Sequence, residues 1–254
     1  MIEETVRELA SNKITKNIFL RKLEECEELR DIDVYDIENL KLLGLPLFEK
    51  DNKLYLKTAF TKIEEERFCI VDIETNGSKR DEHQIIEIGA VMIKGGKEID
   101  RFETFVRSDF LPEAIEKLTG IKIDNLNSAP PLKYVLERFR LFLGDAVFVA
   151  HNVNFDYRFI SSSLKNAGFG PLLNRKLCSI ELAKKVLDLP RYGLGSLIEH
   201  YDISFGEHHR ALCDARSAAY IFNKCIEKLP QDIKTTEELI SFAMPIRKRK
   251  RKKQ

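Results

Sequence analysis

The chain has 254 residues, and 42 lysines and arginines oppose 41 aspartates and glutamates, so the formal net charge is +1. Hydrophobic residues make up 43%, an ordinary share for a soluble protein, and no stretch approaches the roughly 20 apolar residues of a membrane span. The charged N-terminus lacks the apolar segment of a signal peptide, and the five cysteines show no paired spacing. We therefore expect a cytoplasmic protein without a membrane partner.

Residues 1–64 differ in pattern from the rest of the chain. Helical periodicity with dense charge runs from Glu3 to Glu38, and two short strand-like runs then flank the turn at Lys50–Lys53. Helices followed by a hairpin predict a small N-terminal α+β module, of a winged-helix-like kind.

From residue 67 the pattern favours strands. We expect strands at 67–73, 84–93 and 98–107, with the last two antiparallel because Gly95-Gly96 suits a tight hairpin. Two helical stretches should follow Pro112, and "DAVFVAH" reads as another buried strand.

Four further helices are expected near 154–168, 179–187, 194–201 and 211–228. Strands followed by a helix–strand–helix alternation predict an α/β domain with a mixed sheet, which we assign to residues 65–229. Residues 230–254 should form an extension with one short helix and a disordered basic tail, "RKRKRKKQ".

Two acids, Asp72 and Glu74, follow the apolar run "FCIV". Strand residues two apart face the same side, so both carboxylates should leave the carboxyl end of this strand together. Ligands of α/β proteins commonly bind at that edge. An unpaired buried charge costs several kcal/mol, so these acids need a compensating partner.

Other polar residues belong to the same predicted edge. His151, Asn152 and Asp156 follow the "VFVA" strand, and Asp214 lies in an amphipathic helix. Four converging carboxylates would repel one another unless cations lie among them, and carboxylates are preferred ligands of Mg²⁺ and Mn²⁺. A pair of such ions about 3.5–4 Å apart promotes phosphoryl displacement. The pattern therefore favours metal-dependent phosphodiester chemistry.

Three motifs resemble those of the DEDD exonuclease superfamily. They are "DIET" at Asp72–Thr75 with Gly77 following, "HNVNFD" at His151–Asp156, and His209 five residues before Asp214. The sequence is most similar to the DnaQ-like group, typified by the proofreading epsilon subunit of bacterial replicative DNA polymerase. Its tyrosine-dependent relatives have their tyrosine where this chain has Arg210, so the histidine-dependent (DEDDh) subclass fits. The resemblance covers roughly residues 67–228.

The resemblance implies a ribonuclease-H-like domain with a five-stranded mixed sheet flanked by helices. It also implies 3′→5′ exonuclease activity that releases nucleoside monophosphates from single-stranded or frayed DNA ends, as in polymerase proofreading. Two Mg²⁺ or Mn²⁺ ions would be held by the four acids of the motifs, and His209 would be the general base. The expected metal ligands are Asp72, Glu74, Asp156 and Asp214, and the expected substrate contacts are Ile73, Thr75, Asn76, Leu118, His151, Asn152 and Phe155. Asn76 departs from the family, which often has a second threonine there.

Several alternatives remain open in the sequence. The same chemistry could trim RNA 3′ ends, and a non-catalytic subunit that binds a polymerase or a nucleic-acid end is a second rival. The sequence also leaves open whether the protein acts alone or with a DNA polymerase catalytic subunit. Asn152 could cap the following helix, and Asp214 could pair with Arg210. A zinc site at His208, His209 and Cys213 is set aside, because it lacks a matching fourth ligand.

His208 and His209 are expected to point in different directions. Residues five apart on a helix are rotated by about 140°, so His209 and Asp214 cannot share one helical face. We therefore expect His209 in the loop before the helix, and His208 to project elsewhere.

Overall fold

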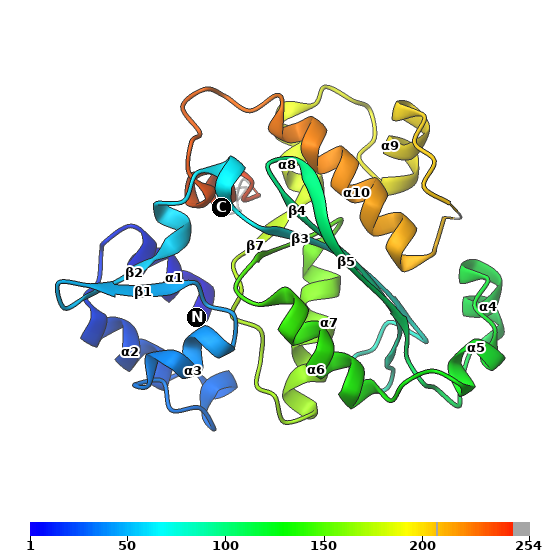
Figure 1. Cartoon of the computed structure of the whole chain (residues 1–254), viewed down its shortest axis with the longest axis horizontal. Helices are drawn as coiled ribbons and strands as arrows, with labels where there is room; N and C mark the ends of the chain where they lie inside the picture. The colour runs from blue at the N-terminus through cyan, green and yellow to red at the C-terminus, as the bar shows by residue number, and fades with distance from the viewer. Residues whose placement is uncertain (207, 246–254) are drawn as a thin grey trace, which may run out of the picture.

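A five-stranded mixed sheet organises most of the chain (Figure 1). The structure is a computed structural model that describes residues 1–206 and 208–245. The strands lie in the order β5-β4-β3-β6-β7; β3, β4 and β5 pair antiparallel, whereas β6 runs parallel to both β3 and β7. Their bounds are β3 (Phe68–Thr75), β4 (Ile85–Lys94), β5 (Lys97–Phe105), β6 (Val147–Ala150) and β7 (Lys176–Cys178). The predicted α/β class and mixed sheet are confirmed.

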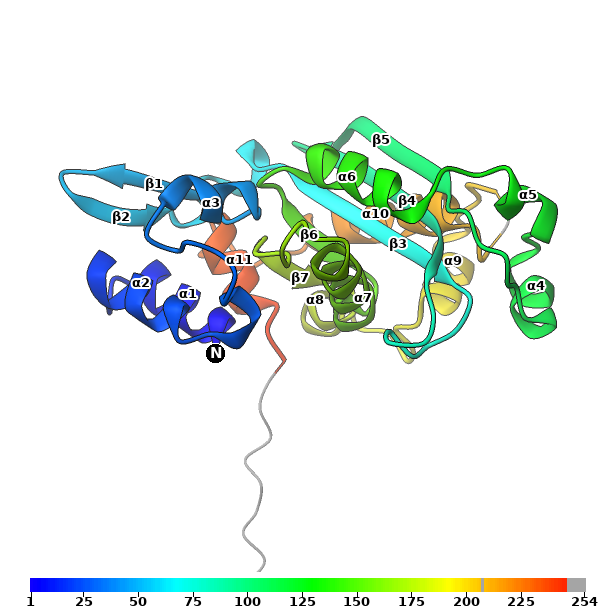
Figure 2. The same cartoon turned by 90° about the horizontal axis from the view of Figure 1, so that it is seen from below.

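Side-chain alternation along β3 divides the core into two layers. Phe68 and Ile70 face a cluster formed with α8 (Ser179–Val186), α10 (Ala211–Ile226) and α11 (Thr236–Phe242). Cys69 and Val71 face the opposite cluster, formed with α6 (Leu132–Leu143) and α7 (Val153–Asn166). Helices therefore cover both faces of the sheet, with α10 and α6 on opposite sides of it (Figure 2).

The segment after Pro112 differs from its prediction. It forms three helices instead of two, namely α4 (Glu113–Thr119), α5 (Ile123–Asn127) and α6. Gly120 ends α4 in the left-handed conformation, with φ 69°, which costs glycine no steric penalty and turns the chain into the next helix. The predicted helix at 194–201 is present as α9 (Leu194–Tyr201).

The start of α10 lies directly on the sheet at Gly89 of β4. A Cβ atom at this position would lie 2.1 Å from backbone atoms of Ala211 and Leu212, closer than non-bonded atoms approach in proteins. The absence of a side chain at Gly89 therefore lets the first turn of α10 approach the strands.

The N-terminal residues have a hydrophobic core of their own. The helices are α1 (Ile2–Ala10), α2 (Lys16–Glu24) and α3 (Ile37–Leu42), and the hairpin strands are β1 (Leu47–Lys50) and β2 (Lys53–Leu56). Phe19, Leu23 and Leu40 are fully buried in this core. The hairpin around Lys50–Lys53 and the α+β character of this module are as predicted.

The N-terminal module is fastened to the larger sheet. Leu173, just before β7, is buried in the N-terminal core, and its N–H donates to the Leu43 carbonyl at 2.8 Å. Lys57 and Arg67 both bind Asp145, each at 2.7 Å. These contacts hold the module beside the end of the sheet at which β3 begins.

The C-terminal helix α11 is packed into the same junction. Glu237 of α11 accepts hydrogen bonds from Arg175, at the start of β7, and from Thr58, which follows the hairpin. All three residues are buried. Leu239 and Ile240 belong to the α10-side core, so the predicted extension begins with a helix integrated into the fold. The predicted basic tail lies outside the described residues.

Among the described residues, no helix combines the length and the apolar character that crossing a bilayer requires.

Candidate functional site

Three carboxylates converge at the end of β3. Asp72 and Glu74 leave the strand on the same side, as the alternation predicts, and Asp214 reaches them from the first turn of α10. One oxygen from each residue lies within 4.8 Å of the other two. These groups line an open cleft of about 300 Å³.

The fourth predicted acid, Asp156, lines the same cleft from the first turn of α7. Its side chain is 4% exposed, and the backbone amides of Asp156 itself and Ile73 favour its charged form. Asp156 is not part of the tight three-carboxylate group. It therefore flanks the acids of β3 without joining their closest cluster.

The concentration of negative charge raises the proton affinity of the site. Burial, followed by repulsion from Glu87, Asp214 and Asp156, raises the pKa of Glu74 to about 8. Burial and the neighbouring carboxylates, Asp156 first, raise the pKa of Asp72 well above its usual range. Burial also raises the pKa of Asp156. Without a cation these acids would hold protons near neutral pH, because their charged forms are both desolvated and crowded.

This donor set fits divalent cations. Mg²⁺ and Mn²⁺ prefer oxygen ligands, and a cation among Asp72, Glu74 and Asp214 would offset the repulsion that raises their proton affinity. The residues suited to hold it are therefore these three, with Asp156 nearby in the cleft.

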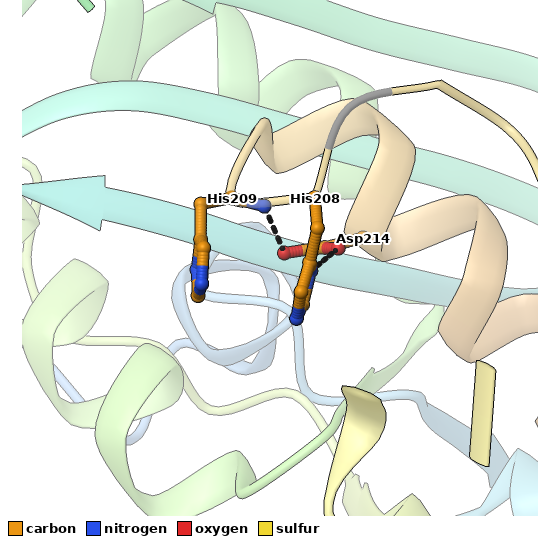
Figure 3. A group of neighbouring side chains, drawn as sticks. All are labelled: His208, His209 and Asp214. Atoms are coloured by element: carbon orange, nitrogen blue, oxygen red, sulfur yellow. Dashed lines mark hydrogen bonds and ion pairs between the residues drawn. The ribbon is translucent and has the colours of Figure 1, made fainter. Parts of the chain in front are cut away.

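Both neighbouring histidines lie in the cleft (Figure 3). His209 lies in the loop before α10, as expected. The prediction that His208 projects elsewhere is wrong: its Nδ1 lies 2.7 Å from Asp214 Oδ1, and its ring stacks on His209 with centroids 4.1 Å apart. The reason is the left-handed backbone at His209, φ 64°, which breaks the alternation that would send consecutive side chains apart.

The histidine loop also holds Asp214 through its backbone. The N–H of His209 donates to Asp214 Oδ2 at 3.1 Å. The two oxygens of this carboxylate are therefore engaged by consecutive residues of the loop. Ligand atoms of His208, His209 and Asp214 lie within 4.8 Å of one another, and Cys213 does not belong to this group.

Arg210 anchors the loop to the sheet. Its guanidinium donates to Glu87 of β4 with a shortest distance of 2.9 Å, and the Ala211 N–H donates to the same carboxylate at 3.2 Å. Glu87 is 1% exposed, whereas the side chain of Arg210 is 30% exposed, so only the carboxylate of this ion pair is fully shielded from water. The alternative that Arg210 pairs with Asp214 is wrong, because the guanidinium faces β4.

His151 connects the end of β6 to the loop before α9. Its Nε2 lies 2.8 Å from the Tyr192 carbonyl, and its Nδ1 lies 2.9 Å from Ser179 Oγ. Burial lowers the pKa of His151 to about 4, so the ring is neutral at pH 7. Because a carbonyl can only accept, Nε2 carries the proton and Nδ1 accepts from the serine hydroxyl. Both nitrogens are thus engaged within the protein, although the residue lines the cleft.

Asn152 occupies the N-cap position of α7 but makes no capping hydrogen bond with its side chain. Its backbone is left-handed, with φ 87°, a conformation that asparagine tolerates better than most residues. The side chain is exposed and lines the cleft. The capping alternative is therefore not realised in the side chain.

The remaining predicted substrate contacts divide into two groups. Ile73 and Phe155 line the cleft, whereas Thr75, Asn76 and Leu118 do not. The buried amide of Asn76 accepts from the Gln84 N–H at 2.8 Å and donates to the Phe110 carbonyl at 3.3 Å. The side chain of Asn76 therefore links the end of β3 to Gln84 and Phe110 through hydrogen bonds. Leu118 is exposed on α4.

Sequence reasoning missed three residues of the cleft, His208, Leu194 and Gly195. Leu194 and Gly195 form the start of α9. Their signal in the sequence is weak, a Gly-Leu-Gly run that opens a helix, and it carries no chemical group that would indicate a site.

A family profile described as "Exonuclease" matches residues 69–222. The chain belongs to the exonuclease family. The resemblance carried by its three motifs is thereby confirmed, and membership implies nuclease activity. The matched segment contains both β3 acids, Asp156, the two stacked histidines and Asp214.

The curated relatives include bacterial polymerases. "DNA polymerase III PolC-type" of Staphylococcus haemolyticus (strain JCSC1435) is 38% identical over 190 residues, and that of Staphylococcus aureus is 35% identical over 190 residues. Each match covers 74% of this chain but only 13% of the relative. The chain thus spans about an eighth of the length of these polymerases, and the exonuclease domain is related to a segment of them.

Solved exonucleases share the fold at low sequence identity. Exonuclease X, solved with 5′ overhanging duplex DNA, has a TM-score of 0.56 and 22% identity, covering 70% of this chain and 99% of that chain. E. coli Exonuclease I with a dA16 oligonucleotide has a TM-score of 0.59 and 16% identity, covering 66% and 42%. The nuclease domain of 3′hExo, a DEDDh family member bound to rAMP, has a TM-score of 0.56 and 18% identity, covering 64% and 92%.

Proposed function

We propose that the chain is a metal-dependent 3′→5′ exonuclease that releases nucleoside monophosphates from single-stranded or frayed DNA ends. The observation that carries this proposal is the meeting of three carboxylates and a loop histidine in one open cleft of an exonuclease domain. Such a donor set suits phosphodiester hydrolysis, because the reaction requires cations around a phosphate and a nearby base.

Each group in the cleft has a proposed role. Asp72, Glu74 and Asp214 would hold two Mg²⁺ or Mn²⁺ ions, with Asp156 assisting. Bound there, such ions supply Lewis acidity that activates water and stabilises the leaving 3′ oxygen. His209 accepts the proton of the attacking water on its imidazole.

The walls of the cleft suit a terminal nucleotide. Phe155 is 36% exposed beside the acids and presents an aromatic face on which a base can stack. Ile73 and Leu194 add apolar surface. Asn152 contributes an exposed amide that can donate to a phosphate oxygen.

We further propose that the 3′ ends attacked are those produced by a DNA polymerase. The support is kinship with a segment of PolC-type polymerases at 38% identity. Retention of a polymerase by the tagged chain from extracts of its native cell would test this association. A chain that copurifies with no polymerase would contradict it.

End-labelled strands test the polarity and the chemistry directly. With Mn²⁺, a 5′-labelled single strand should shorten into a ladder, whereas a 3′-labelled strand should release labelled mononucleotide at once. EDTA should stop both reactions. Release of mononucleotide first from the 5′ label would refute the polarity, and a matched RNA strand measures the sugar preference.

A further inference from the structure

The outer face of the N-terminal hairpin carries a set of side chains that the exonuclease site does not use. Phe48 pairs with Tyr55 in the β1–β2 register, and Lys50 pairs with Lys53. These four side chains share one face of the hairpin, because residues two apart in a strand point the same way. We call them, together with Phe60, the hairpin face.

The opposite face of the hairpin is fully engaged. Leu47, Leu54 and Leu56 are buried in the N-terminal core, and Glu49 pairs with Lys16 of α2. Helices α1 and α2 lie on this side of the hairpin (Figure 2). The acid of β1 is thus directed away from the hairpin face.

The aromatic side chains of the hairpin face form a compact platform. Phe48 and Tyr55 stack with centroids 5.4 Å apart, and Phe60 meets each of them edge-on at 5.7 Å. Phe60 is 59% exposed. Phe48 and Tyr55 are half-buried beside it, and an aromatic cluster that reaches the surface in this way often marks a binding site. Their flat surfaces are the kind on which nucleic-acid bases stack, whatever the sequence.

The lysines beside the platform supply matching charge. Lys50 and Lys53 are exposed and lie directly opposite each other, an arrangement that destabilises a hairpin because like charges repel. A polyanion bound across them would remove that repulsion. Basic side chains next to stacking rings are the combination that binds single-stranded nucleic acid.

The hairpin face is held at a fixed place relative to the exonuclease cleft. Lys57, directly after β2, binds Asp145 at 2.7 Å, and the adjoining strand β6 begins opposite Phe68, the first residue of β3. The cleft lies at the other end of β3. The eight residues of β3, at about 3.3 Å each, by themselves extend over roughly 25 Å.

We infer that the hairpin face binds single-stranded nucleic acid upstream of the 3′ end held in the cleft. Bases stack on Phe48, Tyr55 and Phe60, while Lys50 and Lys53 contact phosphates. The inference rests on the proposed function in one respect, namely that the bound strand is the strand whose end is cleaved. Strands too short to leave the cleft gain nothing from this surface.

Binding can be measured apart from hydrolysis. The full chain carrying Glu74→Gln, kept in EDTA, is titrated into a fluorescent single strand of about 30 nucleotides, longer than the roughly 4–16 that one single-strand-binding fold covers. When Phe60→Ala is combined with Glu74→Gln, the affinity for the strand should fall about fivefold or more, which corresponds to the loss of one stacked base. Lys50→Gln with Lys53→Gln should reduce the slope of log affinity against log salt by roughly 1.4, or about 0.7 for each phosphate contact.

The chain offers matched controls. Lys94 and Lys97 also face each other at an exposed hairpin end, and replacing both with Gln should leave the salt slope nearly unchanged. Tyr134 on α6 is 54% exposed, and Tyr134→Ala controls for Phe60→Ala. Thermal melting confirms that each variant is folded.

The outcomes separate this inference from the proposed function. Parent-like affinity in the Phe60 and lysine variants would overturn the inference, as would an equal loss in the Lys94/Lys97 control. Loss of a bound protein from extracts, with strand affinity unchanged, would identify a protein-docking face and also overturn it. In the Glu74→Gln chain kept in EDTA, no hydrolysis contributes to the measurement. Failure of the proposed function therefore leaves this binding result intact. With Glu74 restored, the same hairpin variants should cleave a very short strand at the parent rate.

Discussion

The His208 and His209 rings stack with 4.1 Å between their centroids and an angle of 15° between their planes. His208 contacts one oxygen of Asp214 through its ring, while His209 contacts the other through its backbone N–H. The contact between His209 and Asp214 does not involve the His209 ring. The Nδ1 of His208, in contrast, is already engaged with Asp214. Figure 3 shows these two contacts with Asp214. The two histidines therefore have different expected roles in the same cleft.

Replacing each histidine should separate these roles. His209→Ala should lower turnover by roughly 10²–10⁴-fold, the usual contribution of a positioned general base. His208→Ala should cost less than about tenfold in turnover, because its contact with Asp214 can be replaced by water. Steady-state rates on one labelled strand measure both. A larger loss in His208→Ala would reverse the assignment of the base.

The crowded acids should make the metal-free protein less stable as the pH rises. The pKa of Glu74 is about 8 in the folded chain, against an ordinary 4.5, so the folded state binds more protons than the unfolded state between these values, and stability falls with increasing pH. His151, with its lowered pKa of about 4, acts in the opposite direction but only below its ordinary value of 6.5.

The test is therefore made above pH 6.5. From pH 6.5 to 8, Glu74 alone should cost about 1–2 kcal/mol in the free energy of unfolding. Thermal or urea melts in EDTA should show the decline, and Glu74→Gln should flatten it by that amount. An identical pH dependence in the two proteins would show that Glu74 does not gain a proton on folding.

The ion pair between Arg210 and buried Glu87 should be important for stability. Arg210→Ala leaves the Glu87 carboxylate with the Ala211 N–H but without its counter-charge. Breaking a buried pair costs 3–5 kcal/mol in other proteins, and partial exposure of this guanidinium suggests about 2–4 kcal/mol here. Arg101→Ala, at an exposed pair with Glu98, should cost less than about 1 kcal/mol. Equal losses in urea unfolding would contradict this account of the loop anchor.

The junction of the two modules can be tested at Glu237. Its carboxylate binds both Arg175 and Thr58 and is buried with them. Glu237→Ala should destabilise the chain by about 3–5 kcal/mol, because the buried guanidinium loses its partner. Glu227→Ala, in an exposed pair with Lys224, serves as the control and should change stability by less than about 1 kcal/mol. Unfolding midpoints in urea compare the two.

The sequence predicts most of the acidic site because its signals are local. Asp72 and Glu74 share a side through strand alternation, and the resemblance of the motifs to the exonuclease family points to Asp156, His209 and Asp214. The position of His208 was not predictable, since it depends on a left-handed backbone at a non-glycine residue. The ion-pair partner of Arg210 was not predictable for a different reason. Glu87 is 123 positions away in the sequence, and no local pattern relates two residues at that separation.

The strands with local sequence signals were predictable, whereas elements that depend on tertiary contacts were not. The long strands β3 and β4 have clear apolar runs, and the Gly95-Gly96 turn indicates that β5 pairs with β4. Strand β7 has only three residues, too few for any period to be visible, and it forms through pairing with β6. The packing of α11 into the core is likewise a tertiary effect, because its helical pattern does not indicate which surface it covers.

The measurement closest to the central claim compares the parent chain with Asp72→Asn in Mn²⁺ and in EDTA. The account predicts that the parent degrades a single strand only with Mn²⁺ and melts at a higher temperature when the ion is bound. Asp72→Asn should lose nearly all activity, remain folded, and melt in EDTA no lower than the parent, because the metal-free site disfavours a charged carboxylate at this position. Near-parent turnover by a folded Asp72→Asn would contradict the carboxylate metal site.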